Sequence, residues 1–477
     1  MSMILGLYGF GYPNTLVYML QNTEYRMGPY LSWYWRTQNF SKVMKRRKLD
    51  QTKAACLLVY CLRVGMGLQI LVGIALISLW RWNNFAPGLY FGLATLISYP
   101  ILWAHLIAVP LVFGRWFVIL KEHKLIKEAE SIFSNHKGIK IAVAGSYGKT
   151  SMKELLITVL SEGKKVAATP ANKNVSASHA QFASKLAGDE DILIIEYGEG
   201  APGDVSRFSR ITHPTHAIIT GLAPAHLDRY STLEAAGKDI FAVADYLRDK
   251  NVYVNEESTE VKTFLKSKYH TYSRNGALGW ITKNIEVTIN GINFDLVKAN
   301  RNLHLKSELL GKHQVGPLSL AAALALEFGM TDEQVISGID RTLPFEHRMQ
   351  PYQLNGAWII DDTYNGNIEG IRAGTELLKD LPGKRKLYVT PGLVDQGVET
   401  VNVHKTMGEL IAKANPDIVV LMNNSVTKYI KAGLESSGFK KELIIEKNPL
   451  DFYTNLEHFV AAGDLMIMQN DWTDNYV

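Results

Sequence analysis

Residues 139–151, with the sequence IKIAVAGSYGKTS, organise the rest of the chain. An apolar β-branched run predicts a strand, a glycine loop follows it, and Gly-Lys-Thr opens a predicted helix. Backbone N–H groups of a loop built on Gly145 and Gly148 can surround phosphate oxygens at a helix N-terminus. Lys149 would neutralise the terminal phosphates and the Thr150 hydroxyl would bind Mg²⁺. The stretch therefore predicts a nucleotide phosphate site, with a chance turn after a strand as the alternative.

Short β-branched runs and helical stretches alternate after this loop, which is typical of a parallel sheet covered by helices. Strands are expected at residues 164–169, 191–196, 216–220, 251–255, 386–390, 417–422 and 464–468, with a hairpin at 287–296. Ligands of such sheets lie beyond the carboxyl ends of the strands, so polar residues that close the runs are candidates. Glu196 closes ILIIE and either caps a helix or binds a cation. His226, in APAHLD, is either a metal ligand or a solvated or core histidine.

The apolar residues are concentrated before residue 121. Residues 54–80 and 85–120 are each long enough to cross a bilayer, which takes about 20 residues. Pro87, Pro100 and Pro110 are expected to kink or interrupt the second of these runs. Residues 1–20 lack a basic start, so we expect a third span or an interfacial helix there, not a signal peptide. Segment 21–54 is rich in Lys and Arg and is expected on the cytoplasmic side. The two long spans then form a hairpin, which leaves everything after about residue 121 in the cytosol.

The composition is that of a globular protein with an apolar addition: 477 residues, 47% hydrophobic and 20% charged, predict two or three domains. A net charge of +5, from 51 basic and 46 acidic residues mixed through the chain, gives no indication of a nucleic-acid partner. Cys56 and Cys61 both lie in an apolar run, which argues against a disulfide framework and against a cysteine metal cluster.

Several motifs in order resemble the Mur ligase family, the ATP-dependent amide ligases of cell-wall peptide synthesis. The compact G-x-x-G-K-T loop and APAHLD resemble the family, and EYGEGAPGDV and DDTYNGN resemble its D-alanyl-D-alanine-adding (MurF-like) branch most closely. The resemblance covers about residues 137–477 and implies an α/β fold. It implies a central P-loop ATP-binding parallel-sheet domain at residues 137–343 and a C-terminal Rossmann-like domain at 344–477. Transmembrane helices of residues 1–136 would take the place of the family's UDP-sugar-binding domain.

The same resemblance implies roles for individual residues. The implied ATP contacts are Gly145, Ser146, Gly148, Lys149, Thr150, Ser151, His313, Gln314, Arg348 and Asp362. The implied Mg²⁺ ligands are Thr150, Glu196, His226 and Lys238, and the implied substrate contacts are Asn172, Asn174, Tyr364 and Asn365. Lys149, His226, Lys238 and Arg348 would be catalytic. Lys238 would act as a carbamate, although its spacing departs from the family pattern and a solvated helix lysine is the alternative.

The implied reaction is an ATP-dependent ligation in which an amine attacks an acyl phosphate. The expected cofactors are ATP and Mg²⁺, and the expected substrates are an amino acid or peptide and a UDP-linked or lipid-linked precursor. The expected location is the cytoplasmic membrane, as a multi-pass protein with cytoplasmic catalytic domains near other cell-wall enzymes. The ending NDWTDNYV departs from the family pattern and leaves the substrate open. The alternatives are a membrane-bound polyglutamate-synthase-like ligase and a non-catalytic nucleotide-binding scaffold.

Overall fold

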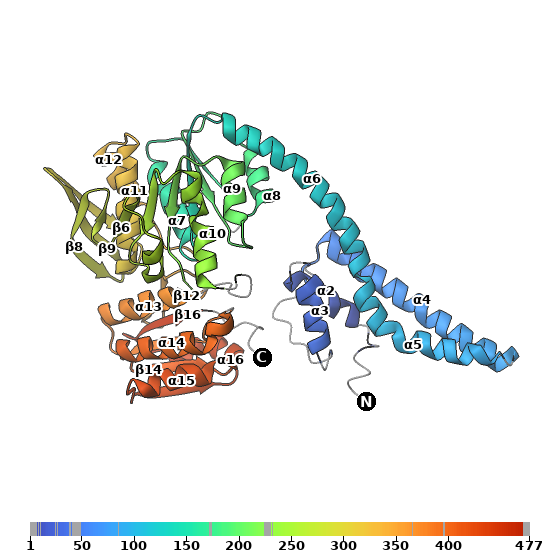
Figure 1. Cartoon of the computed structure of the whole chain (residues 1–477). Helices are drawn as coiled ribbons and strands as arrows, with labels where there is room; N and C mark the ends of the chain where they lie inside the picture. The colour runs from blue at the N-terminus through green and yellow to red at the C-terminus, as the bar shows by residue number, and fades with distance from the viewer. Residues whose placement is uncertain are drawn as a thin grey trace. The chain divides into compact units, whose positions relative to one another are not determined.

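The chain divides into two compact units, Met1–His123 and Lys124–Val477, and each is described by itself (Figure 1). The computed structural model describes all residues except 1–6, 8, 10, 24, 26, 38–39, 41–48, 84, 171–173, 224–229, 231, 365, 395 and 471–477, and the side chains of residues 108 and 112–122.

The first unit is helical. Its helices are α2 (Tyr12–Asn22), α3 (Met27–Arg36), α4 (Lys53–Asn83), α5 (Ala86–Leu106) and the beginning of α6 (Ala108–Asn135). Helices α4 and α5 lie side by side as a hairpin (Figure 1). Glycines permit this close packing, because a Cβ on Gly92 would lie 2.8 Å from the Gly73 carbonyl oxygen, and one on Gly88 would lie 2.6 Å from the Leu76 carbonyl oxygen.

Two helices of the described chain are long and apolar enough to cross a membrane, judged by length and composition. They are Lys53–Asn83, with a hydropathy of 1.9, and Ala86–Leu111, with a hydropathy of 1.6. Within the apolar run over 85–120, α5 ends at Leu106 and α6 begins at Ala108, an interruption of the kind expected from the prolines. Pro110 lacks the N–H that would bond the Leu106 carbonyl, and its ring clashes with that carbonyl. Helix α2 has 11 residues, fewer than the about 20 that a span takes, so the described part of residues 1–20 contains no helix long enough for a third span.

The second unit begins with a ten-stranded sheet in the order β10-β9-β8-β7-β6-β5-β4-β1-β3-β2. The strands are β1 (Ile139–Ala144), β2 (Val166–Ala168), β3 (Ile192–Glu196), β4 (His216–Ile219), β5 (Val252–Asn255), β6 (His270–Ser273), β7 (Gly276–Ala277), β8 (Trp280–Thr288), β9 (Gly291–Lys298) and β10 (Arg301–Ser307). Neighbours from β2 to β6 pair in parallel, and β6 to β10 pair antiparallel. The four strands predicted after the loop correspond to β2, β3, β4 and β5. The predicted hairpin is part of the longer β8–β9 ribbon.

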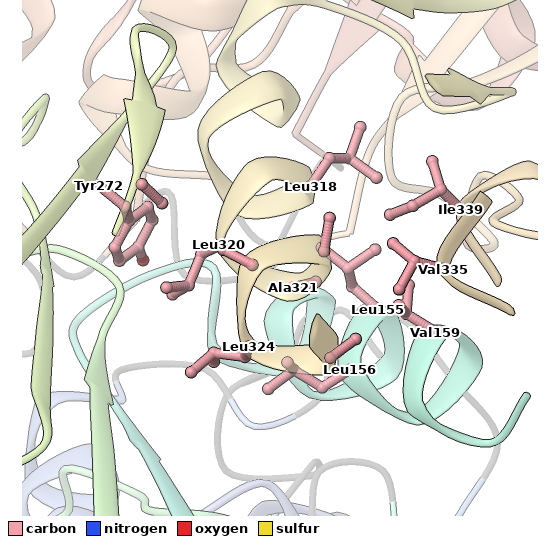
Figure 2. Packing of buried hydrophobic residues seen from close by; sticks show 14 of the residues in the cluster. Leu155, Leu156, Val159, Tyr272, Leu318, Leu320, Ala321, Leu324, Val335 and Ile339 are labelled. Carbon is pink, nitrogen blue, oxygen red and sulfur yellow. The ribbon is translucent and has the colours of Figure 1, made fainter. Parts of the chain in front are cut away.

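Helices cover both faces of the parallel part, because its strands are apolar on both sides. Ile141 and Val143 of β1 face a core shared with α7 (Lys149–Leu160), α11 (Val315–Glu327) and α12 (Asp332–Asp340). Figure 2 shows how leucines of α7 and α11 meet Val335 and Ile339 of α12. The alternate residue Ala142 faces the second core, shared with α8 (Ser176–Ala183), α9 (Asp204–Thr212) and α10 (Leu233–Tyr246). The buried β1 strand therefore holds the loop that follows it in a fixed position.

A six-stranded sheet follows, in the order β11-β12-β16-β13-β14-β15. The strands are β11 (Gln350–Leu354), β12 (Ala357–Asp362), β13 (Lys386–Thr390), β14 (Ile418–Met422), β15 (Glu442–Glu446) and β16 (Leu465–Gln469). All pairs are parallel except β11–β12. Helices α13 (Ile368–Asp380), α14 (Thr400–Ala414) and α15 (Thr427–Ser436) pack into one core, and α16 (Pro449–Thr454) and α17 (Leu456–Phe459) into another. Parallel sheets with helices on both faces confirm the predicted α/β class.

Candidate functional site

A cavity of about 1050 Å³ lies between the two sheets of the second unit. Its lining includes Lys149 of α7 and Glu196 of β3, together with Asp362 of β12 and Arg348, which precedes β11. Residues separated by some 200 positions therefore meet at one site, beyond the carboxyl ends of parallel strands, where such sheets bind their ligands.

The glycine loop at the end of β1 has a backbone that only glycine adopts easily. Gly145 has φ 141° and Gly148 has φ 71°, and a Cβ on Gly145 would lie 2.3 Å from Thr220 Oγ1. The Ser146 N–H donates to the Gly221 carbonyl at 2.9 Å, which ties the loop to the end of β4. No described side chain caps the N-terminus of α7, so its first N–H groups are available to an anion.

Lys149 and Thr150, the first residues of α7, each contact a glutamate. The Lys149 ammonium donates to the Gly145 carbonyl oxygen and to Glu199 Oε1, the latter at 3.0 Å. The Thr150 hydroxyl donates to Glu196 Oε1 at 3.1 Å. Thr150 and Glu196, two of the implied Mg²⁺ ligands, are thus in direct contact, while the Glu199 contact was not anticipated.

The Glu196 carboxylate is 2% exposed and is held from several sides. The Asn174 amide donates to its Oε1 at 3.2 Å, and Lys153 Nζ lies 3.4 Å from its Oε2. Lys153 is fully buried and also donates to the Thr169 carbonyl oxygen at 3.0 Å. Among the residues that the structure describes, Glu196 Oε2 nevertheless has no hydrogen-bond partner. An acceptor oxygen of this kind beside a threonine hydroxyl fits a hard cation.

The described residues include no group of three His, Cys, Asp or Glu side chains that could enclose a metal ion. This does not argue against Mg²⁺, because Mg²⁺ is commonly held by one or two carboxylates together with substrate phosphates and water. Thr150 and Glu196 would supply the protein ligands, next to the loop that would bind the phosphates.

Arg348 and Asp362 form the opposite wall of the cavity. The Arg348 guanidinium lies 4.3 Å from the centre of the Tyr364 ring, a cation–π contact. Asp362 accepts from the Gln469 amide at 2.7 Å and from the Met349 N–H at 3.3 Å. Burial raises the pKa of Asp362 to about 7, in spite of these two donors.

His313 and Gln314 lie in a 3₁₀ turn, Lys312–Gln314, and both line the cavity. Burial lowers the pKa of His313 to about 4, so the ring is neutral near pH 7 and accepts from the Gln314 amide at 3.0 Å. Lys312 Nζ lies 2.9 Å from Asp380 Oδ2 of α13. The turn that carries these two implied ATP contacts is therefore joined to helix α13.

Arg274 is a further cavity residue that the sequence did not reveal. It follows β6, and its guanidinium lies 3.1 Å from Glu257 and 2.8 Å from Glu376 of α13. Together with the Lys312 pair, this contact fastens α13 to the ten-stranded sheet. Arg274 belongs to no recognisable motif, so no sequence signal marked it.

Of the remaining predicted residues, Lys238 stands apart from this constellation. The Lys238 side chain is 70% exposed, pairs with Glu234 at 2.7 Å along α10, and is not among the cavity residues. This position corresponds to the solvated helix lysine that was the alternative. His226, Asn172 and Asn365 lie outside the described residues.

Comparison with known proteins agrees with the motifs. Residues 143–325 match the family profile described as the Mur ligase middle domain. The chain is 28% identical over 291 residues to the UDP-N-acetylmuramoyl-tripeptide–D-alanyl-D-alanine ligase of Escherichia coli (strain K12), covering 59% of this chain and 63% of the relative. It is 29% identical over 300 residues to the ligase of the same name from Synechocystis sp., covering 61% and 64%.

Solved structures agree on the fold. MurF from Thermotoga maritima in complex with ADP superimposes with a TM-score of 0.64 at 21% identity, covering 73% of this chain and 80% of that one. The chain spans just under two thirds of the length of the two curated relatives, 63% and 64%.

Proposed function

We propose that this chain, which contains a Mur ligase middle domain at residues 143–325 and is related to MurF ligases, is an ATP-dependent amide ligase of cell-wall precursor synthesis. The observation that supports it most strongly is that Lys149, Thr150 and Glu196 line the same cavity as Arg348 and Asp362. Residues 137–343 would form the P-loop ATP-binding domain and residues 344–477 the Rossmann-like domain.

ATP would lie across the cavity with its phosphates on the glycine loop. The N–H groups at the start of α7 and the Lys149 ammonium would neutralise one side of the phosphates, and Arg348 the other. His313 and Gln314 would contact the adenine, and Asp362 the ribose. Mg²⁺ on Thr150 and Glu196 would neutralise charge that builds up on the transferred phosphoryl group.

The proposed reaction has two steps. A substrate carboxylate attacks the γ-phosphorus of ATP, ADP leaves, and an acyl phosphate forms. The nitrogen of an amine then attacks the acyl carbon, and phosphate leaves as the amide bond forms. Lys149 and Arg348 act by positioning and charge neutralisation, which are the main demands of phosphoryl transfer.

The names of the relatives suggest the substrates. Those proteins join D-alanyl-D-alanine to a UDP-N-acetylmuramoyl-tripeptide, and we propose the same dipeptide as the amine for this chain. The carboxylate would belong to a UDP-linked or a lipid-linked peptide. The α4–α5 hairpin would anchor the protein in the cytoplasmic membrane, with its catalytic unit in the cytoplasm. We favour the lipid-linked precursor, because a membrane confines enzyme and substrate together and raises their effective concentration.

The test is ADP release by the full-length protein in detergent micelles with ATP and Mg²⁺. We expect release only when D-alanyl-D-alanine and a UDP-linked or lipid-linked tripeptide are both present, with faster turnover of the lipid-linked form. Lys149→Ala should abolish release, whereas Lys165→Ala, which removes an exposed lysine paired with Asp189, should leave it unchanged. Release with glutamate in place of the dipeptide would instead identify a polyglutamate-synthase-like ligase. Nucleotide binding without release under any condition would indicate a scaffold.

A further inference from the structure

Glu199 is an acidic residue in a place where phosphates are expected. Its side chain is 6% exposed, and its Oε1 lies 3.0 Å from the Lys149 ammonium, which is itself only 12% exposed. Both residues line the cavity. The lysine that should serve a nucleotide therefore already has a carboxylate partner.

Glu199 and Glu196 differ in how their charges are balanced. Glu196 has Lys153, a fully buried cation, and also accepts from Thr150 and Asn174. For Glu199, Lys149 is the only cation within 4.0 Å among the residues that the structure describes. The charge of Glu196 is thus compensated permanently, whereas that of Glu199 depends on the position of Lys149.

Phosphate binding would disturb this balance. When Lys149 turns to the phosphate oxygens, the Glu199 carboxylate is left with no cation beside new negative charge. A buried carboxylate without a partner is unfavourable, so another cation must replace the lysine. The amine substrate is such a cation, because an α-amino group has a pKa of about 7.7–8.0 and is largely protonated near neutral pH.

We propose that Glu199 is an exchangeable counter-ion, which holds Lys149 before the nucleotide binds and then binds the ammonium group of the attacking amine beside the acyl phosphate. The ammonium gives one proton to the Glu199 carboxylate, and the freed lone pair attacks the acyl carbon. The second proton leaves the nitrogen with the departing phosphate, and Glu199 releases its proton to solvent. This role depends on the proposed ligase function, and it adds a catalytic residue to it.

The proposal predicts opposite effects of Glu199→Gln on two measurements. ADP should bind about tenfold more tightly, because the neutral amide no longer competes for Lys149. The kcat/KM for D-alanyl-D-alanine should fall by about 100-fold or more, the usual size of a general-base contribution. A residue that merely supported the local structure would weaken both. Glu199→Asp, which keeps the charge on a shorter side chain, should give intermediate values.

Glu154→Gln is the matched control. It removes one negative charge from the same helix as Lys149, at a side chain that is 32% exposed and paired with Lys153. Both ADP affinity and kcat/KM of this variant should stay within about threefold of wild type, since Glu154 is partly solvated and Lys153 keeps Glu196 as its partner.

ADP binding is measured by calorimetry, and turnover by ADP release, on full-length protein in detergent. If Glu199→Gln binds ADP no more tightly than wild type, Glu199 does not compete for Lys149 and the proposal is overturned. It is also overturned if the variant needs more Mg²⁺ while its KM for the dipeptide is unchanged, since Glu199 would then be a metal ligand. Failure of the wild-type protein to bind ADP would overturn the ligase function, and this role with it.

Discussion

Lys153 offers the sharpest test of how the site is held together. Its side chain is fully buried, and its ammonium lies 3.4 Å from Glu196 Oε2, 3.1 Å from Glu154 Oε1 and 3.0 Å from the Thr169 carbonyl oxygen. Lys153→Met keeps a similar length of side chain and removes the charge. Glu154 remains partly solvated in this variant, but Glu196 becomes a buried carboxylate without a cation.

The expected loss follows from this burial. Removal of one partner of a buried ion pair lowers the free energy of unfolding by about 3–5 kcal/mol. The control is Lys165→Met, whose pair with Asp189 is exposed at both side chains, 51% and 69%, and should cost less than about 1 kcal/mol. Urea titrations of the full-length protein in detergent, followed by circular dichroism, would compare the two variants.

A second variant separates the charge effect from a packing effect. In Lys153→Met with Glu196→Gln, no uncompensated carboxylate remains, so we expect recovery of about half or more of the lost stability. If Lys153→Met costs less than about 1 kcal/mol, or if the double variant is as unstable as the sum of the two single variants, the ion-pair account of Glu196 is wrong.

Three further predictions concern other parts of the site. Lys238→Ala should retain ADP release within about twofold, because its exposed ion pair with Glu234 contributes little. If the variant instead loses activity and a small added carboxylate restores it, Lys238 acts as a carbamate. The raised pKa of Asp362, about 7, means that the folded state binds more protons than the unfolded state between about pH 4 and pH 7. The free energy of unfolding should therefore fall as pH rises through that window and level off above it. In Asp362→Asn, the midpoint of urea unfolding should no longer show this decrease with pH. Arg274→Ala breaks the contacts with Glu376 of α13. In the absence of nucleotide, the distribution of distances between labels on the two sheets should therefore become broader. An unchanged distribution would mean that the ion pair does not hold the sheets together.

Local patterns were sufficient for most of the parallel strands. Strands that are buried on both faces read as continuous apolar runs, and β13 begins and ends at the predicted residues, Lys386–Thr390. The antiparallel strands were harder, because β7 has only two residues and the apolar residues of β10 are limited to Leu303 and Leu305. The prolines of the apolar run at 85–120 predicted a kink or an interruption, and the chain forms two helices there, α5 and α6; the break between them follows from the position of Pro110 relative to Leu106.

For the site, the sequence alone determined the loop with Lys149 and Thr150 and the strand-end carboxylate Glu196, because the loop and the strand end are each local features. It could not determine that Lys153 and Glu199 complete this charge network, or that Arg274 reaches α13. These contacts require atoms about 3 Å apart on segments up to 102 residues apart, so they depend on strand order and on helix direction. The exposure of Lys238 also depends on the tertiary structure, because α10 is oriented so that this side chain faces Glu234 and the solvent.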